Sequence, residues 1–154
     1  MTMLTRHEEE VEYVTAMVGT QMFGVPITRV LDVFAPTRVT RVPLAPKEVA
    51  GVLNLRGRIM TAVCMRRRLG LSPRELEDKC MALGVEADGE AYGLIVDAVG
   101  EVLKLPVADR DAIPVNLEPA WARVAAGVHG LEGRLLVVLD VDRCLEHRNE
   151  ALAA

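Results

Sequence analysis

The chain has 154 residues and a net charge of −4; 51% of its residues are apolar and 26% are charged. This balance is that of an ordinary globular domain and argues against disorder over most of the length. The negative charge argues weakly against a general nucleic-acid role. No run reaches the roughly 18 apolar residues that a membrane-spanning helix needs, and residues 1–12 lack the apolar segment of a signal peptide. We therefore expect a cytoplasmic protein.

The first half of the chain favours strands. Val-rich and aromatic segments bounded by glycine and proline predict strands at residues 13–18, 22–25, 30–33, 51–55 and 58–63. Short helices are expected at residues 47–50 and 65–69, the second of them stopped by Gly70. A polar linker begins at Pro73.

The second half repeats this plan. Strands are expected at residues 79–86, 91–97, 99–105, 125–131 and 134–141, with a hairpin turn at Asp88-Gly89 between the first two. The composition of residues 142–152 is helical, and this segment is expected to dock back across the body. The cysteines at positions 64, 80 and 144 are unclustered and lie in apolar surroundings, so we expect reduced core thiols rather than a disulfide framework or a zinc site.

Two stretches of the chain show that it is an internal duplication. Gly51–Arg58 returns 76 positions later as Gly127–Arg134, with five of eight residues identical. Phe23-Gly24-Val25 and Tyr92-Gly93-Leu94 support the duplication, because each is followed after the same interval by a segment that contains valine. Units of about 70 residues are too small for a large core of their own. We therefore predict an all-β fold of two β-barrels, each of about five strands, packed side by side.

The same pattern predicts the organisation of the chain. We expect one domain over residues 11–146, which follows a polar tail at residues 1–10. Within it, the first subdomain is expected at residues 11–72, the second at residues 78–141, and a C-terminal helix at residues 142–152.

Four segments, in this order and spacing, resemble the CheW family of chemotaxis coupling proteins over roughly residues 11–146. They are Gly51–Ile59, Arg66–Leu69, Gly93–Val102 and Leu139–Asp142. The resemblance implies two SH3-like five-stranded barrels with short helices. It also implies a non-enzymatic scaffold, without cofactor or metal, that joins chemoreceptor tips to the regulatory domain of the CheA histidine kinase at receptor arrays.

The resemblance also implies where a receptor binds. The positions that match the receptor-facing side of the family are Val30, Gly51, Leu53, Arg56 and Gly57. The residues that bind the kinase are not located by it. Direct insertion into a membrane and binding of nucleic acid are not implied.

Two residues depart from the family pattern after the Arg56-Gly57 turn. Thr61 stands where proline is usual, and Cys64 stands where aspartate is usual, whereas the second repeat keeps Asp140. A carboxylate there is expected to cap the following helix by accepting backbone N–H bonds, which a thiol does poorly. The loss is expected to cost about 1 kcal/mol. Such a departure also fits an adaptor of a non-standard chemosensory array.

Other interpretations stay open. Arg56 is alternatively a solvated turn residue, and the arginines at positions 66–68 are expected to form a solvated helix face rather than a nucleic-acid site, because no aromatic residue accompanies them. Asp140 and Asp142 lack a third metal ligand in the sequence pattern, which favours capping. A small-molecule or enzymatic domain on the same duplicated scaffold is the rival hypothesis, and it requires a cluster of convergent polar groups.

Overall fold

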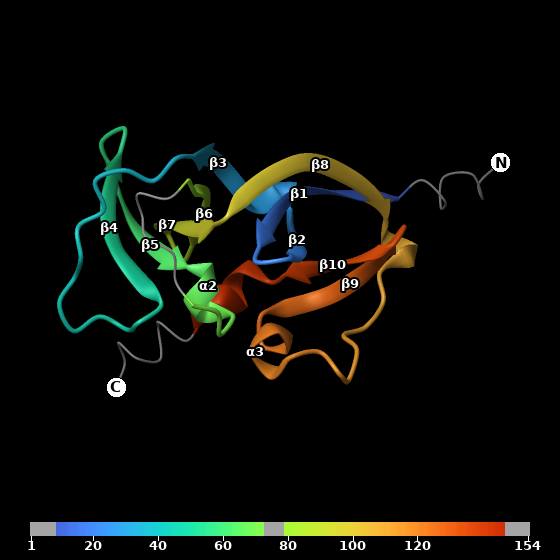
Figure 1. Cartoon of the computed structure of the whole chain (residues 1–154). Helices are drawn as coiled ribbons and strands as arrows, with labels where there is room; N and C mark the ends of the chain where they lie inside the picture. Colours follow the sequence, from blue (N-terminus) through green and yellow to red (C-terminus); the bar gives the residue numbers. More distant parts are fainter. Residues whose placement is uncertain (1–8, 73–78, 147–154) are drawn as a thin grey trace.

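The computed structural model describes residues 9–72 and 79–146, which form strands joined by short helices (Figure 1). In chain order the elements are β1 (Glu10–Val18), β2 (Gln21–Pro26), η1 (Ile27–Arg29), β3 (Val30–Phe34), β4 (Val49–Leu55), β5 (Arg58–Cys64), α2 (Met65–Arg68), β6 (Met81–Ala87), β7 (Glu90–Val96), β8 (Ala98–Pro106), η2 (Val107–Asp109), α3 (Pro119–Ala122), β9 (Ala125–Leu131) and β10 (Arg134–Leu139). Residues 141–146 form a further helix.

All the predicted strands are present, but three local predictions need comment. No helix forms at residues 47–50, where a turn leads directly into β4 at Val49. Val49 pairs with Val63 of β5, and a β-branched residue in a ladder is more stable extended than in a single helical turn. The last strand ends at Leu139 rather than at 141, because the C-terminal helix already begins there. Residues 147–152 of the predicted helix lie outside the described part.

The strands form two five-stranded sheets, with the orders β8-β1-β2-β10-β9 and β3-β6-β7-β5-β4. We call them sheet A and sheet B. Each sheet takes strands from both repeats, so the expectation that residues 11–72 and 78–141 each form a barrel is wrong. The physical reason lies in the connections. Only the short η1 joins β2 to β3, and only Asp97 joins β7 to β8, so the chain continues into the neighbouring sheet instead of turning back.

The strand registers confirm the duplication. Phe23 of β2 lies opposite Val137 of β10, and the matching pair in sheet B is Tyr92 opposite Thr61. Both pairings are parallel. The register shift between Val30 and Asp32 also recurs at the equivalent place in the pairing of β1 with β8. The two repeats therefore exchange strands reciprocally, as two identical subunits of a swapped dimer would: the last three strands of each repeat lie in the sheet that contains the first two strands of the other repeat.

A glycine makes room for a crossing segment in each repeat. Gly51 has a φ of +150°, and a Cβ there would lie 2.2 Å from the carbonyl oxygen of Thr40. The close approach allows Thr40 and Val52 to exchange two backbone hydrogen bonds of 2.8 Å. In the second repeat, a Cβ on Gly127 would lie 2.9 Å from the carbonyl oxygen of Asp111. These glycines are required by packing, which accounts for their place in the repeated motif.

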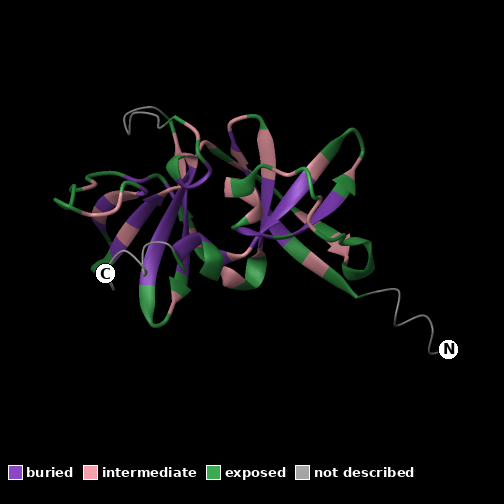
Figure 2. Ribbon diagram, turned by 90° about the horizontal axis from the view of Figure 1, so that it is seen from below, coloured by how far each residue is buried: buried purple, intermediate pink, exposed green. Residues whose placement is uncertain are grey.

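The main hydrophobic core extends across both sheets, and Figure 2 shows the buried residues concentrated along the strands. It includes Phe23 and Val137 from sheet A and Leu83 and Leu94 from sheet B, all with no exposed surface. Burying a side chain of this size stabilises the fold by roughly 1.5–3 kcal/mol. The two sheets therefore share one core and do not fold as independent bodies. The cysteines are free, and burial raises the pKa of the Cys144 thiol to about 12.

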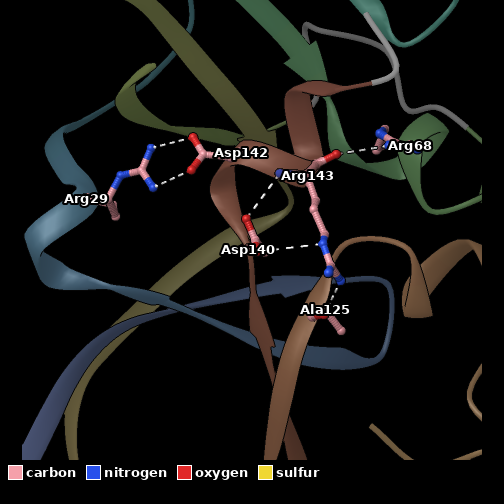
Figure 3. A network of polar contacts seen from close by, with 6 residues as sticks. All are labelled: Arg29, Arg68, Ala125, Asp140, Asp142 and Arg143. Carbon is pink, nitrogen blue, oxygen red and sulfur yellow. Dashed lines mark hydrogen bonds and ion pairs between the residues drawn. The ribbon is translucent and has the colours of Figure 1, made fainter. Parts of the chain in front are cut away.

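Two ion pairs connect elements of opposite repeats at equivalent places. Arg66 of α2 donates two hydrogen bonds, of 2.9 and 2.8 Å, to the carboxylate of Asp97, which also accepts the backbone N–H of Gly19 at 2.8 Å. In the other half, Arg29 donates to both carboxylate oxygens of Asp142, at 3.3 and 3.0 Å (Figure 3). In the first pair the helix carries the arginine and the connection carries the aspartate, and in the second pair this order is reversed. Each pair fixes a helix start against the connection that carries the chain between the sheets.

A buried tyrosine–histidine pair lies in a smaller part of the core. The Tyr13 hydroxyl is 3.2 Å from Nε2 of His129, the two rings meet edge to face at 5.3 Å, and both side chains are almost fully buried. Burial lowers the pKa of His129, and the nearby Arg110 lowers it further, whereas Asp109 and Asp111 oppose the shift. The histidine is therefore neutral in the folded protein at neutral pH.

Because of His129, the free energy of unfolding is expected to decrease as the pH is lowered. A histidine whose pKa is lower in the folded state binds its proton more weakly there than in the unfolded chain, where the pKa is about 6.5. Its contribution is present above that value and is lost as the pH drops below it. We expect the melting temperature to fall between pH 7 and pH 5 by more in the natural protein than in a His129→Gln variant. Parallel curves for the two proteins would contradict this.

Candidate partner-binding surface

The β4–β5 hairpin presents an arginine at its tip. Arg56 and Gly57 both have positive φ values, 52° and 84°, which is the backbone of a two-residue type I′ turn. The Asn54 side chain supports the turn by accepting the backbone N–H of Gly57 at 2.8 Å. The guanidinium side chain is 73% exposed. A rigid turn therefore holds a cation out into solvent.

Arg56 contacts a carboxylate of another strand. Its guanidinium donates a hydrogen bond to Asp32 of β3, whose other carboxylate oxygen accepts the backbone N–H of Val33 at 2.8 Å. The hydrogen bond from Arg56 is the main reason that the pKa of Asp32 is lowered, so this carboxylate is charged at neutral pH. The remaining N–H groups of a guanidinium, which has five donors, are available to a partner.

Three of the five residues implied for receptor binding are internal. Leu53 is only 5% exposed and packs in the core of sheet B, and Gly51 is buried against the crossing segment. Val30 is half-buried and packs against the main core. Arg56 and Gly57 are exposed. Arg56 and Gly57 are therefore accessible at the hairpin tip, whereas the other three residues lie mostly inside, in the strands beneath it.

Exposed aliphatic side chains lie on β3, which carries Asp32, and on β5, which follows the Arg56-Gly57 turn. Leu31 and Val33, on either side of Asp32, are 53% and 39% exposed, and Ile59 of β5 is 63% exposed. Leu31 and Val33 alternate with Asp32, so they face the other side of β3 from the ion pair. We name only Arg56, Gly57 and Ile59 the hairpin-tip residues. Ile59 was not among the sequence-predicted site residues. A cation and an exposed aliphatic side chain on one hairpin are suited to protein binding.

The capping role predicted for Asp140 is confirmed. Asp140 precedes the helix of residues 141–146, and its carboxylate accepts the backbone N–H of Arg143 at 3.2 Å (Figure 3). Cys64 occupies the equivalent place before α2 and makes no side-chain capping bond. The backbone before the two helices is held in the same way. The Cys64 N–H donates to the carbonyl of Glu48, and the Asp140 N–H donates to the carbonyl of Val124.

Restoring the carboxylate is expected to stabilise α2. In Cys64→Asp, the new side chain has the spacing to accept the backbone N–H of Arg67, as Asp140 accepts that of Arg143. A gain of about 0.5–1 kcal/mol in the free energy of unfolding, or at worst no change, should follow in thermal melts. Asp140→Cys is the reverse control and should lose a similar amount. A clear drop in the melting temperature of Cys64→Asp would show instead that burial of the new charge dominates.

The expectation that the arginines at positions 66–68 form a solvated face is wrong for two of them. Arg66 is bound to Asp97, as described above. Arg68 is only 8% exposed and donates to the backbone carbonyl of Cys144 at 3.1 Å. It also donates to the carbonyl of Arg143 at 3.0 Å (Figure 3). Arg67 is exposed. The motif therefore fastens α2 to the C-terminal helix and is mainly structural.

The described residues form few other arrangements that suggest chemistry. Within residues 9–72 and 79–146, no three His, Cys, Asp or Glu side chains are grouped closely enough to hold a metal ion. An open hollow of about 500 Å³ lies beside β1 and is lined by a few charged and aliphatic residues, namely Glu10, Val11, Glu12, Pro26, Ile27, Thr28 and Lys104. Among the described helices, none has the length and apolar character required to cross a membrane.

Known proteins resemble the chain over nearly its whole length. The profile of the CheW-like domain matches residues 12–149. The Chemotaxis protein CheW of Rhizobium meliloti is 34% identical over 136 residues, which cover 85% of this chain and 84% of that protein. The Chemotaxis protein CheW of Thermotoga maritima is 29% identical over 138 residues, covering 90% of this chain and 89% of that protein.

A solved structure supports the same relationship. The crystal structure of the scaffolding protein TtCheW from Thermoanaerobacter tengcongensis matches with a TM-score of 0.74 and 25% identity, and the match covers 86% of each chain. The match confirms the all-β architecture of two β subdomains. The family consists of non-catalytic scaffolds, so the rival interpretation as an enzyme is not supported. The chain belongs to the CheW-like family and is a scaffold protein of chemotaxis.

Proposed function

We propose that this chain couples the cytoplasmic tips of chemoreceptors to the regulatory domain of a CheA-type histidine kinase. It does so in the cytoplasm, at receptor arrays. The observation that carries the proposal is the exposed Arg56 at a rigid hairpin tip, within a domain that belongs to the CheW-like family. The chain performs no reaction in this role; it holds two partners in one assembly.

The hairpin-tip residues are the receptor-binding surface in this proposal. A guanidinium donates charge-assisted hydrogen bonds to carboxylates or carbonyls of a partner helix, each contributing roughly 1.5–3 kcal/mol where water is excluded. Ile59, on the same hairpin and 63% exposed, supplies apolar contact area. Val30, Gly51 and Leu53 support this surface from within. The kinase binds other faces of the two sheets, which leaves the receptor surface accessible.

Pull-down experiments with purified proteins test the proposal. The chain is offered separately to an immobilised chemoreceptor cytoplasmic fragment and to the immobilised regulatory domain of the kinase. A receptor fragment that lacks the helical tip is the matched control. Retention by the intact fragment and by the kinase domain, but not by the tipless fragment, is expected. Failure to bind either partner, or equal binding to the tipless fragment, would refute it.

A further inference from the structure

The connection between β3 and β4 is unusually basic for this acidic chain. We call residues 35–47 the basic loop. It contains Arg38, Arg41 and Lys47 and no acidic residue; the residue that follows it in the connection, Glu48, is buried. All three side chains are exposed, and none forms an ion pair with another described residue. Elsewhere in residues 30–72 the arginines at positions 56, 58 and 66 are paired with carboxylates, so the unpaired positive charge is concentrated in the basic loop, in a protein whose net charge is −4.

Leu44, at the outer end of this loop, has an unfavourable backbone conformation and an unfavourably exposed side chain. Its side chain is fully exposed, with a relative accessibility of 104%, and its φ is +66°. A branched residue in the left-handed region is strained, and an exposed leucine contributes nothing to the core. Glycine would satisfy the backbone better. Strained residues that contribute nothing to folding are concentrated at functional sites, so this leucine is a candidate contact for a partner.

The duplication provides an internal comparison for the basic loop. Pro43-Leu44 corresponds to Pro114-Val115 in the second repeat, and Val115 is also fully exposed. The equivalent loop, residues 106–118, carries one basic and three acidic residues, whereas the basic loop carries three basic residues. The fold therefore tolerates either charge in this loop. The positive charge is a property of the first repeat and is not needed for folding.

The loop is held in an accessible position. Its middle is fastened to β4 by the two backbone hydrogen bonds between Thr40 and Val52. From there it runs around the outside of β4 and away from sheet A (Figure 1). At physiological salt, electrostatic interactions are screened beyond roughly 8–10 Å. A partner at this loop therefore interacts with the local cations and not with the net charge of the chain. A fixed base and an exposed, cationic outer end suit a docking element.

We propose that the basic loop is a docking surface for an acidic protein segment that places an apolar side chain against Leu44, as the face of an acidic amphipathic helix does. Nucleic acid fits less well, because the loop contains no aromatic residue for base stacking. An anionic membrane also fits less well, because the negative net charge opposes approach to a large anionic surface and a single leucine inserts little apolar area. The proposal does not depend on the receptor role of Arg56.

The experiment uses a synthetic helical peptide of 20 residues, with leucines along one face flanked by glutamates, and measures its binding by fluorescence anisotropy. Arg38→Glu/Arg41→Glu in the full chain should weaken binding at low salt by at least tenfold. Leu44→Gly should weaken it about threefold or more without lowering the melting temperature. Arg110→Glu/Arg123→Glu, which makes the same charge change, and Val115→Gly, all between β8 and β9 of the second repeat, are matched controls and should bind like the natural protein.

Several outcomes would overturn the proposal. One is equal binding by the basic-loop variants and the control variants. Another is equal binding of a second peptide in which serine replaces every leucine, since Leu44 then has no role. Stronger binding to vesicles of 30% phosphatidylserine than to the peptide would assign the loop to a membrane. Self-association of the chain that the basic-loop variants abolish, measured by analytical ultracentrifugation, would assign it to a second copy.

Discussion

Replacing Asp97 by alanine should lower the free energy of unfolding by about 3 kcal/mol. The side chain is 14% exposed, accepts two hydrogen bonds from Arg66 and a third from the backbone of Gly19, and so joins α2, the β7–β8 connection and the β1–β2 turn. The alanine variant leaves a largely buried guanidinium without its carboxylate, and removing one member of such a pair costs more than the pair itself contributes. Because the contact joins both sheets, its loss should weaken the whole fold.

Urea unfolding followed by circular dichroism measures this effect. The matched control is Asp142→Ala, which removes the equivalent carboxylate from the other repeat. Asp142 is 68% exposed, and an exposed ion pair contributes little, so the control should lose less than about 1 kcal/mol. Equal losses in the two variants, or a negligible loss in Asp97→Ala, would show that the ion pair does not connect the sheets energetically.

Arg56→Glu should weaken binding to the receptor fragment by at least tenfold. The substitution removes the donor of charge-assisted hydrogen bonds and places a carboxylate beside Asp32, so the hairpin tip becomes repulsive to an acidic partner. The melting temperature should barely change, because the arginine is 73% exposed and its ion pair is on the surface. The repeat supports this expectation, since the equivalent hairpin turn carries Glu132 before Gly133.

Calorimetry with receptor fragment and with kinase regulatory domain, at one salt concentration, separates binding from folding. Arg134→Glu makes the same charge change in the second hairpin and should leave receptor affinity unchanged. Kinase affinity should survive both substitutions. If the natural protein and Arg56→Glu bind the receptor equally, Arg56 is a solvated turn residue. If Arg134→Glu weakens binding as much as Arg56→Glu does, net charge and not the hairpin tip determines affinity.

The strands and the duplication could be predicted from the sequence because both are local signals. Alternation of apolar residues marks the strands, and the repeated glycine-bounded motif marks the repeat. The exchange of the last three strands between the repeats could not be predicted. β3 and β8 have similar patterns, and nothing in a pattern decides whether Val30 pairs with a strand of its own repeat or of the other one. Which strand it pairs with depends on the direction of the backbone at the two short connections, η1 and Asp97.

The candidate site was predicted in part. Arg56 and Gly57 could be located because a turn is a local signal, whereas the burial of Leu53 depends on packing between strands. A resemblance marks residues that the fold requires as well as residues that a partner touches, and Gly51 is of the first kind. The roles of Arg66 and Arg68 depend on partners 31 and 76 positions away in sequence, which a charge pattern does not reveal.

Co-sedimentation of three components tests the coupling role most directly. Receptor cytoplasmic fragments assembled on vesicles are mixed with the kinase regulatory domain, with or without this chain, and the pellet is quantified. We predict that the regulatory domain is recovered with the receptor when the chain is present, and that its recovery falls strongly without the chain or with Arg56→Glu. Recovery that is independent of the chain, or receptor and kinase that compete for it, would contradict a scaffold that holds both at once.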